Sequence, residues 1–416
     1  MKRVLLLNTS ERTGGAAIAA SRLLSALNKN GLTASLMVRD KQTSNVAVHS
    51  VGSKWLMAAR FVWERFTIFA SSGFNKKNVW QVDIANVGTD VTKTSEFKQS
   101  DVVHLHWVNQ GFLSMRGLRD ILHSGKKVVV TMHDMWYFTG ICHYAGGCDK
   151  YQSSCEDCPL LKKSSLMGDY AKKVFRKKSE LFRDADITFV GCSRWMAEMA
   201  RSSSLTQGHK VLNIPNAIDT DYFAPFDKSA ARKKMGLPEK RKLILFGSQR
   251  ITDERKGFRY LVEACDSLMK TNPDLARQLT VVVVGANSED VAASVPLEVV
   301  PVAYVSDERS MISLYNAVDL YVTPSLQDNL PNTIMEAMSC GTPCVGFDVG
   351  GIPEMIDHQR TGYVAHYKDA SDFAEGISWC LDESRYDLLC QESRKRVLNE
   401  YSEKRVASLY KDAYGI

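Results

Sequence analysis

Two carboxylates lie eight positions apart in the segment from 324 to 338, at Asp328 and Glu336. Asp328 follows an apolar run predicted to be a buried strand, and Glu336 lies inside the helix predicted from Leu330 to Cys340. Acids at this spacing are ordinarily solvated surface charges, but ligands of an open parallel sheet gather at the carboxyl ends of its strands. The start of the helix also directs backbone N–H groups at the same place. The segment therefore predicts a site that binds phosphate and sugar hydroxyls.

A basic loop from 246 to 258 carries Arg250, Arg255 and Lys256. It follows the first strand of a second α/β pattern and precedes a predicted helix, which is where doubly wound folds bind phosphates. We expect Lys256 and one arginine to bind a diphosphate, since a guanidinium stays charged and contacts two oxygens at once. Arg250 is favoured because it lies nearer the strand end, and Arg255 is otherwise a surface charge. No Asp-x-Asp motif appears in a suitable context, so these cations are expected to assist the leaving group without Mg²⁺.

The first half of the chain also places polar residues after predicted strands. His133 ends the strand predicted from 127 to 132 and is expected to face a crevice, although a lone histidine is more often structural. Three residues follow the preceding strand and either line an acceptor side or close the edge of the sheet: His104, His106 and Trp107.

A glycine pair follows the first predicted strand, which runs from Val4 to Asn8. Gly14 and Gly15 have no side chain, so the backbone there can approach donor phosphates or an acceptor closely. The segment lacks the Gly-x-Gly-x-x-Gly pattern, which argues against an NAD-dependent dehydrogenase.

Four cysteines form a dense group that ends in Cys-x-x-Cys: Cys142, Cys148, Cys155 and Cys158. This spacing suits a closed tetrahedral zinc site that pins an insertion from 140 to 160. The alternatives are reduced thiols in a loop or two disulfides.

Strand-like runs alternate with helical stretches in both halves, the pattern of parallel sheets covered by helices. A length of 416 residues exceeds what one core usually organises. We predict a first Rossmann-like α/β domain from 1 to 218 and a second from 219 to 395. The prolines and polar residues from 211 to 225 indicate the exit from the first domain.

These motifs together resemble glycosyltransferase family four, whose retaining members carry Glu-x7-Glu between Pro-Ser and a Glu-Ala-Met helix, followed by Gly-x-Pro and Gly-Gly-x-x-Glu. The chain has the same order, with Gly-Thr-Pro at 341–343 and Gly-Gly-Ile-Pro-Glu at 350–354. It departs from the pattern at Asp328, which is one methylene shorter than glutamate, and at Ser248, where the family has its arginine. Within the family it resembles the enzymes of exopolysaccharide or colanic-acid synthesis.

The resemblance implies a GT-B architecture, in which two Rossmann-like domains face each other across a cleft and a helix from 396 to 416 returns to the first domain. It implies that Glu336 holds the ribose of the nucleotide, that Asp328 contacts the donor sugar and that His133 approaches that sugar. Further donor contacts are implied at Asn329, Leu330, Pro331 and Asn332.

The resemblance also implies a UDP- or GDP-sugar donor, hexosyl transfer with retention, and a glycan or lipid-linked glycan acceptor in surface polysaccharide synthesis. No motif places a carboxylate as a general base, which favours retention as well. Two other functions stay open: a nucleotide-sugar epimerase of similar fold, and a glycan- or nucleotide-binding relative without turnover. The epimerase requires a different set of acids, whereas Asp328 and the displaced arginine keep the second alternative open.

The net charge is +6, and no basic stripe with interleaved aromatics appears, which argues against nucleic acid as a partner. The first apolar run is too short for a signal peptide, and no window of ~18 apolar residues is present, so we expect a cytoplasmic protein. Basic residues bunch in one stretch, which predicts a solvated helix face: Lys162, Lys163, Lys172, Lys173, Arg176, Lys177 and Lys178.

A helix predicted from 54 to 69 combines aromatic and basic side chains. This pattern suits a helix that rests on the inner membrane surface, where a lipid-linked acceptor would be held. Packing onto the first domain is nevertheless expected for most of its side chains. Those side chains are Trp55, Leu56, Phe61, Val62, Trp63, Phe66 and Phe69, with Lys54, Arg60 and Arg65 among them.

Overall fold

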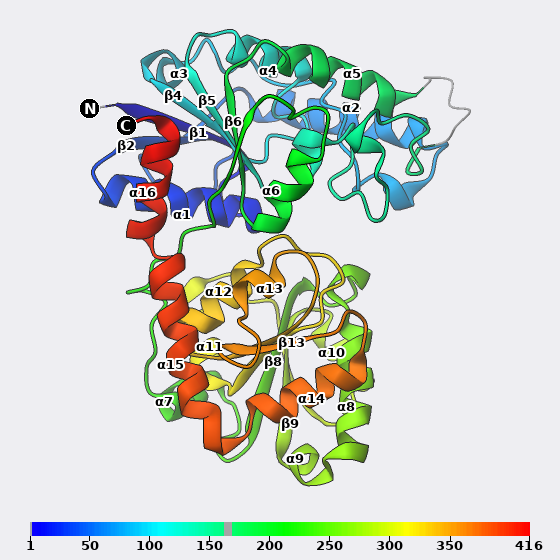
Figure 1. Cartoon of the computed structure of the whole chain (residues 1–416), viewed down its shortest axis with the longest axis vertical. Coiled ribbons are helices and arrows are strands. Elements are labelled where there is room, and N and C mark those ends of the chain that lie inside the picture. The colour runs from blue at the N-terminus through cyan, green and yellow to red at the C-terminus, as the bar shows by residue number, and fades with distance from the viewer. Residues whose placement is uncertain (1, 162–168) are drawn as a thin grey trace. The chain divides into compact units, whose positions relative to one another are not determined.

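The structure, a computed structural model, describes residues 2–161 and 169–416 and divides into two compact units (Figure 1). The first unit comprises Met1–Ala217 and Val406–Ile416, and the second comprises Ile218–Arg405. The second unit therefore extends past 395, because α15 (Glu383–Glu400) packs on α12 (Asn332–Ser339) of the same unit.

The first unit is built on a seven-stranded parallel sheet in the order β3-β2-β1-β4-β5-β6-β7. Its central strands are nearly continuous apolar runs, as expected for a parallel sheet that is covered on both faces. The strands are β1 (Arg3–Ser10), β2 (Thr33–Asp40), β3 (Val48–Ser50), β4 (Val102–Leu105), β5 (Lys127–Met132), β6 (Ile187–Gly191) and β7 (Lys210–Asn213). The last of these is a regular strand within the stretch predicted to leave the domain.

Helices cover both faces of this sheet. Along β1, Val4 and Leu6 pack into one core with α1 and α16, while Leu5 and Leu7 pack into the opposite core. This alternation follows from the two-residue period of a strand. The helices are α1 (Gly15–Lys29), α2 (Lys54–Ser71), α3 (Ser95–Gln99), α4 (Met115–Leu122), α5 (Tyr170–Phe182), α6 (Arg194–Arg201) and α16 (Glu403–Tyr414), with short 3-10 turns at Lys76–Asn78, Trp136–Phe138 and Lys150–Gln152.

The second unit contains a six-stranded parallel sheet in the order β10-β9-β8-β11-β12-β13. One face of it packs on α8 and α14 through a core that includes Leu261 and Ile377. The strands are β8 (Lys242–Arg250), β9 (Leu279–Ala286), β10 (Glu298–Val302), β11 (Leu320–Thr323), β12 (Cys344–Phe347) and β13 (Gly362–Ala365). The helices besides α12 and α15 are α7 (Lys228–Met235), α8 (Phe258–Thr271), α9 (Pro273–Gln278), α10 (Ser288–Ala292), α11 (Glu308–Ala317), α13 (Ile352–Met355) and α14 (Ala370–Cys380), with a 3-10 turn at Glu254–Lys256.

Strand order reverses once in each sheet, between β1 and β4 and between β8 and β11. In doubly wound sheets, ligands bind outside the carboxyl ends of the strands at this reversal. The topology also corrects one expectation for His104 and its neighbours. Because β4 is a central strand, these residues cannot close an edge of the sheet.

Candidate functional site

Lys256 and Asp328 form the centre of the candidate site in the second unit. Lys256 ends the turn after β8, Asp328 lies in the loop after β11, and these two strands are neighbours in the sheet. The Lys256 Nζ atom lies 2.7 Å from an Asp328 carboxylate oxygen. Both side chains are only partly exposed, so the two motifs predicted separately meet at the reversal of strand order.

Backbone packing fixes this meeting. Gly257 has a φ of +69°, and a Cβ there would lie 1.9 Å from the carbonyl oxygen of Pro324. Gly350 has a φ of +60°, and its Cβ would lie 1.8 Å from the carbonyl oxygen of Asp328. Leu326 also donates its backbone N–H to the Arg255 carbonyl at 2.7 Å. The glycines let three loops approach so closely that Lys256 and Asp328 must be adjacent.

Glu336 lies on α12 and is 8% exposed. Its carboxylate accepts a hydrogen bond of 2.8 Å from the Tyr315 hydroxyl. Burial and the neighbouring carboxylate raise the pKa of Tyr315 well above its usual value, so the phenol stays protonated and keeps donating. The loop residues before α12 divide by burial: Asn329, Leu330 and Pro331 are buried, whereas Asn332, the first residue of α12, is half-buried.

The two candidate arginines differ in their surroundings. Arg250 ends β8, is exposed, and forms no ion pair with the described residues. Arg255 is also exposed, but its guanidinium lies 2.7 Å from an Asp253 carboxylate oxygen. Arg250 is thus the arginine whose head group is not already paired with an acid of the same loop.

In the first unit, Gly14 and Gly15 are exposed at the start of α1. Gly14 has a φ of +93° and caps the helix, and a Cβ there would meet no other atom within 4 Å. The glycine at 14 is therefore required by backbone conformation, and open space surrounds it.

Three histidines stack at the carboxyl ends of β4 and β5. His133 Nε2 lies 3.0 Å from His106 Nδ1, and their rings are stacked. His133 Nδ1 lies 3.5 Å from the thiol of Cys192. His104 contacts the hydroxyls of Thr131 and Tyr414 at 2.7 and 2.8 Å.

Burial keeps these rings neutral. It lowers the pKa of His104 to about 3, with a further contribution from His133. The pKa of His133 falls to about 4 because of burial, partly opposed by the charge of Asp134. The pKa of His106 is also well below its usual value. The stack is therefore uncharged at neutral pH, and His133 is a neutral imidazole whose two nitrogens both face protein groups.

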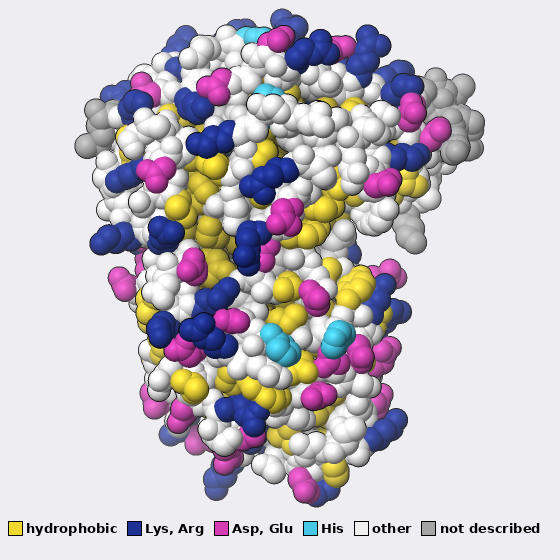
Figure 2. All heavy atoms as spheres, in the orientation of Figure 1, with side chains coloured by type: hydrophobic (Ala, Val, Ile, Leu, Met, Phe, Trp, Pro, Cys, Tyr) yellow, Lys and Arg dark blue, Asp and Glu magenta, His cyan; other side chains and the backbone are white. Residues whose placement is uncertain are grey.

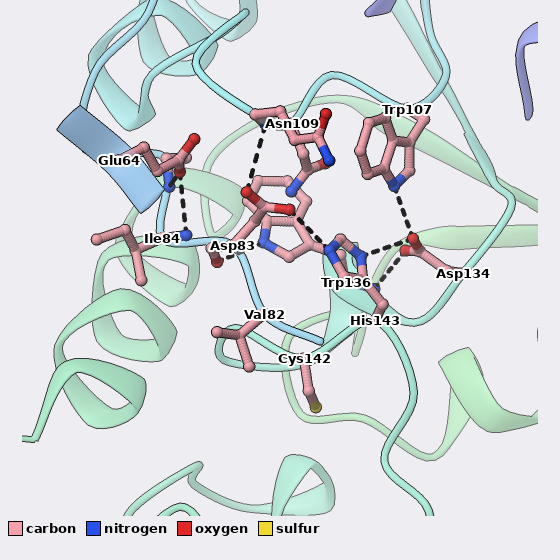
Figure 3. A network of polar contacts seen from close by, with 12 residues as sticks. Glu64, Val82, Asp83, Ile84, Trp107, Asn109, Asp134, Trp136, Cys142 and His143 are labelled. Carbon is pink, nitrogen blue, oxygen red and sulfur yellow. Dashed lines mark hydrogen bonds and ion pairs between the residues drawn. The ribbon is translucent and has the colours of Figure 1, made fainter. Parts of the chain in front are cut away.

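A second polar cluster follows directly after His133 and was not predicted. His143 lies between two carboxylates, with Nδ1 at 2.7 Å from Asp134 and Nε2 at 2.7 Å from Asp83 (Figure 3). The second oxygen of Asp83 accepts a hydrogen bond from Arg65. Burial raises the pKa of Asp134, but the charge of His143 and hydrogen bonds from His143, Trp136 and Trp107 outweigh it and lower the pKa below its usual value.

The sequence held a signal for this cluster. Asp83 stands between Val82 and Ile84 in an otherwise apolar stretch, and each of the three is at most 2% exposed. A charged residue at such a position requires a buried partner.

The cysteine group does not form the predicted metal site. Among the described residues, no three Cys, His, Asp or Glu side chains are placed to hold a metal ion, and all four thiols are free. Cys155 instead accepts a hydrogen bond from the Gly140 backbone at 3.2 Å. Figure 3 shows the Cys142 side chain pointing away from His143. The arrangement supports neither the zinc site nor the two disulfides, and leaves reduced thiols in a loop.

The basic stretch is also not one solvated face. Lys162 and Lys163 lie outside the described residues, and Lys172, Lys173, Arg176 and Lys177 are exposed on α5. Lys178 is fully buried and contacts the carbonyls of Trp136, Thr139 and Gly140. Its ammonium also lies 3.6 Å from the centre of the Trp136 ring. Burial lowers its pKa to about 7, opposed by the nearby thiols and Asp134.

The helix α2 buries apolar and charged side chains together. Met57 and Ile68 pack into the core of the first unit, and Glu64 and Arg65 hold the segment from 79 to 85 through backbone hydrogen bonds. Its outer face and the segment that follows leave large apolar side chains between 50% and 87% exposed: Trp55, Leu56, Val62, Trp63, Phe66, Phe74 and Trp80. We call these seven residues the apolar face. Packing onto the domain was expected for most of the aromatic and aliphatic side chains of this helix, and it is wrong for the five of them that belong to the apolar face.

Comparison with known families covers both units. A model described as Glycosyltransferase Family 4 matches residues 13–222, just over half of the 416 residues, and one described as Glycosyl transferases group 1 matches residues 240–383. The chain belongs to glycosyltransferase family 4. All predicted donor-side residues from Arg250 to Glu336 fall within the second match.

Among family 4 relatives, a D-inositol 3-phosphate glycosyltransferase from Corynebacterium aurimucosum is 29% identical over 220 residues, which cover 50% of this chain and 51% of the relative. The chain thus spans about half the length of the curated relatives it matches.

Solved structures match over the whole chain. Sucrose-phosphate synthase from Thermosynechococcus elongatus gives a TM-score of 0.67 at 18% identity and covers 100% of this chain and 98% of that chain. HepE from Anabaena, in complex with UDP and glucose, gives 0.64 at 15% identity and covers 100% of both chains. These likenesses show that this family 4 chain has the GT-B fold with two Rossmann-like domains.

The described residues show no membrane-spanning helix, and one face of the molecule carries mixed charges. No helix in the described ranges is long and apolar enough to cross a bilayer. On the face shown in Figure 2, Lys and Arg side chains are interspersed with Asp and Glu.

Proposed function

We propose that the chain transfers a hexose from a UDP- or GDP-sugar to a glycan or lipid-linked glycan, with retention of anomeric configuration. The observation that carries the proposal is the 2.7 Å pair of Lys256 and Asp328 where the second sheet reverses its strand order, with Glu336 on the helix α12 that follows the Asp328 loop. HepE, which shares the fold, was solved with UDP and glucose, and this supports a nucleotide-sugar donor.

Four side chains of the second unit each have one role in binding the donor. Lys256 and Arg250 neutralise the diphosphate, Glu336 accepts hydrogen bonds from the ribose, and Asp328 accepts them from the donor sugar. The short Lys256–Asp328 pair supports a cation at the boundary between sugar and diphosphate, where the bond breaks. Fixed positive groups there stabilise the charge that develops on the leaving phosphate.

Retention of configuration is proposed because neither Asp328 nor Glu336 is available as a general base. Both acids serve in binding, and neither is left as a base on the face opposite the diphosphate. The bond from C1 to the phosphate oxygen breaks, the acceptor oxygen bonds to C1 from the same face, and the acceptor proton passes to the departing phosphate oxygen. His133, neutral and with both nitrogens facing His106 and Cys192, stabilises the sugar region and does not act as the base.

The test is an acceptor-dependent assay in EDTA followed by NMR of the fresh product. We expect nucleoside diphosphate to appear only when acceptor is supplied, turnover to survive chelation, and the product to keep the donor's anomeric configuration. An inverted product would overturn the mechanism, and loss of turnover that Mg²⁺ restores would overturn the role of the cations. Nucleotide binding without any transfer would make the chain a non-catalytic relative.

We further propose that the apolar face rests on an anionic membrane surface, where a lipid-linked acceptor of surface polysaccharide synthesis is held. The helix packs on the first unit through Met57 and Ile68, so the more than half-exposed Trp63 and Phe66 are not used in that packing. Glu64 is the only acid between Lys54 and Trp80, and it is buried, so the exposed charges of this stretch are positive. Aromatic residues with basic neighbours suit the headgroup region of anionic lipids.

Vesicle sedimentation tests this placement. We expect binding to vesicles that contain phosphatidylglycerol, because an anionic surface attracts basic interfacial segments, and at least tenfold weaker binding after Trp63→Ser with Phe66→Ser. Leu388→Ser, at an equally exposed apolar position on α15, is the control. Equal binding of the double variant would exclude the apolar face. Comparing lipid-linked glycan with soluble inositol phosphate as acceptors would separate this proposal from the activity named for the corynebacterial relative.

A further inference from the structure

A buried network of charged side chains runs from Arg65 through Asp83 and His143 to Asp134, and the proposed donor site does not use it (Figure 3). It joins three separate parts of the first unit: α2, the stretch around Asp83, and the loop after β5. Every member is nearly inaccessible, with side-chain exposures of 9%, 0%, 12% and 12% in that order.

The ring of His143 is held from both sides, because each of its nitrogens lies 2.7 Å from a carboxylate oxygen, one of Asp134 and one of Asp83. Arg65 holds the second oxygen of Asp83, and the Gln110 backbone N–H approaches the same oxygen at 3.3 Å. The ring of His143 is thus fixed in position and in rotation.

Asp134, the last member of this network, holds Trp107 after β4 and the backbone after β5. Asp134 accepts a hydrogen bond of 2.8 Å from the indole N–H of Trp107, which directly follows β4, and the Trp107 ring also lies beside that of His143. The other oxygen of Asp134 accepts from the Trp136 backbone at 2.9 Å. Asp134 is the residue after His133, so the same contacts set the backbone that carries the histidine stack.

Stability alone does not account for this arrangement. Burying four ionisable groups costs desolvation free energy, and apolar residues of similar size commonly serve a core as well or better. What such a network supplies is orientation, because each partner has one geometry that satisfies all of its bonds.

We infer that Arg65, Asp83, His143 and Asp134 position Trp107 at the carboxyl end of β4 for the acceptor, and hold the backbone that follows His133 at the end of β5. The inference rests on the proposed function, since it names the part of the first unit that orients the acceptor. Trp107 is half-buried, so one part of the indole stays accessible while its N–H is held. These four residues act through others and are positioning residues.

The experiment compares His143→Gln with Asp186→Asn, which removes an exposed ion pair with Lys127 at the amino end of β5. For His143→Gln we expect the acceptor KM to rise and kcat/KM for the acceptor to fall about 100-fold, the scale of an ångström misplacement. UDP affinity should stay within about twofold, because the donor groups lie in the second unit. Asp186→Asn should match the wild type.

A second readout is independent of turnover. The indole N–H resonance of Trp107, assigned by its loss in Trp107→Phe, should shift in His143→Gln while the indole resonances of the exposed Trp55 and Trp63 keep their positions. If His143→Gln does not fold, Trp107→Phe decides, and it should raise the acceptor KM with the charges left intact. A wild-type acceptor KM or an unshifted resonance in His143→Gln would overturn the inference. If the wild-type chain transfers no sugar, the proposed function fails and the resonance alone tests the positioning.

Discussion

At the scale of single residues, the pairing of Lys256 with Asp328 shows how two weak motifs become a site. Neither Lys256 nor Asp328 would indicate a site by itself, since solvated charges are common on any protein surface. Their distance of 2.7 Å, in loops packed through glycines that admit no side chain, brings opposite charges together at the reversal of strand order, where we propose that the diphosphate and the sugar bind.

Replacement of Lys256 or Glu336 by alanine is expected to lower transfer at least 100-fold, because each removes a charged contact to the nucleotide in the transition state. The circular dichroism spectrum should stay unchanged. Lys270→Ala, at an exposed position on the same helix that follows Lys256, should keep full activity. Wild-type turnover in either site variant would show that the assignment is wrong.

The neutral histidine stack predicts how stability depends on pH. His104 has a folded-state pKa of about 3, whereas an unfolded histidine titrates near ~6.5. As pH falls below about 6.5, the unfolded chain takes up a proton that the folded chain does not. The free energy of unfolding therefore falls by up to ~1.4 kcal/mol per pH unit for this group, until about pH 3.

His104→Gln should reduce that slope, since glutamine does not titrate. Urea unfolding of the first unit at pH 7, 6 and 5, followed by hydrogen exchange at β4 and β5, measures the difference. An identical slope in the variant would mean that His104 is already protonated in the folded state.

At the scale of elements, α5 shows why a pattern of charges can mislead. Its buried residues fall at Ala171, Val174, Phe175, Lys178 and Phe182, the spacing of one helix face. Lys178 therefore occupies an apolar position, and its charge is satisfied by three carbonyls of the loop after β5. The prediction of a solvated face is thus wrong for Lys178, because the position of a residue in the helical period decides its burial here.

Gly257→Ala is expected to weaken UDP binding at least tenfold and to destabilise the second unit by more than the ~1–2 kcal/mol of a left-handed alanine. The added Cβ would lie 1.9 Å from the Pro324 carbonyl oxygen and must push Lys256 away from Asp328. Gly236→Ala is the matched control, because its φ is +65° but its Cβ meets open space. Calorimetry and UDP titration report both effects. Equal losses in the two variants would show that only backbone strain matters.

The fold was predictable where strands are apolar runs. The bounds of β5 coincide with the strand predicted from 127 to 132, because buried parallel strands leave no polar alternation to interpret. The motifs that carry Lys256 and Asp328 could be found because each is short and local, and their role as donor contacts stays a prediction. His143 and Asp83 could not be paired from sequence, since sixty positions separate them and only the tertiary fold brings them together. The cysteines misled because their spacing allows a metal site that the loop does not form.

At the scale of the whole molecule, the chain crosses between its units twice, near Ala217 and near Arg405. The second crossing returns α16 to the first unit, where Tyr414 contacts His104 and Tyr410 contacts Thr131, both at 2.8 Å. The last residues are thus part of the core under β1 and β4.

A chain that stops at Arg405 should lose more than about 3 kcal/mol of stability in the first unit alone, because it exposes the pocket of two buried tyrosines and a valine. Hydrogen exchange should accelerate in β1 and β4 and stay unchanged in β8 and β11. A chain that stops at Tyr414 lacks only exposed residues and serves as the control. Unchanged exchange in β1 would show that α16 adds nothing to that core.

This returning helix also sets the order of events on the ribosome. The first 217 residues emerge early, but Val406 follows only after the 188 residues from 218 to 405 have been made. At ~5–20 residues per second, that interval is about 10–40 s. Throughout it, Val4, Leu6 and their neighbours lack one of their covering helices. The half of the protein that is synthesised first is therefore the half that is completed last, and until then nascent chains need protection from one another.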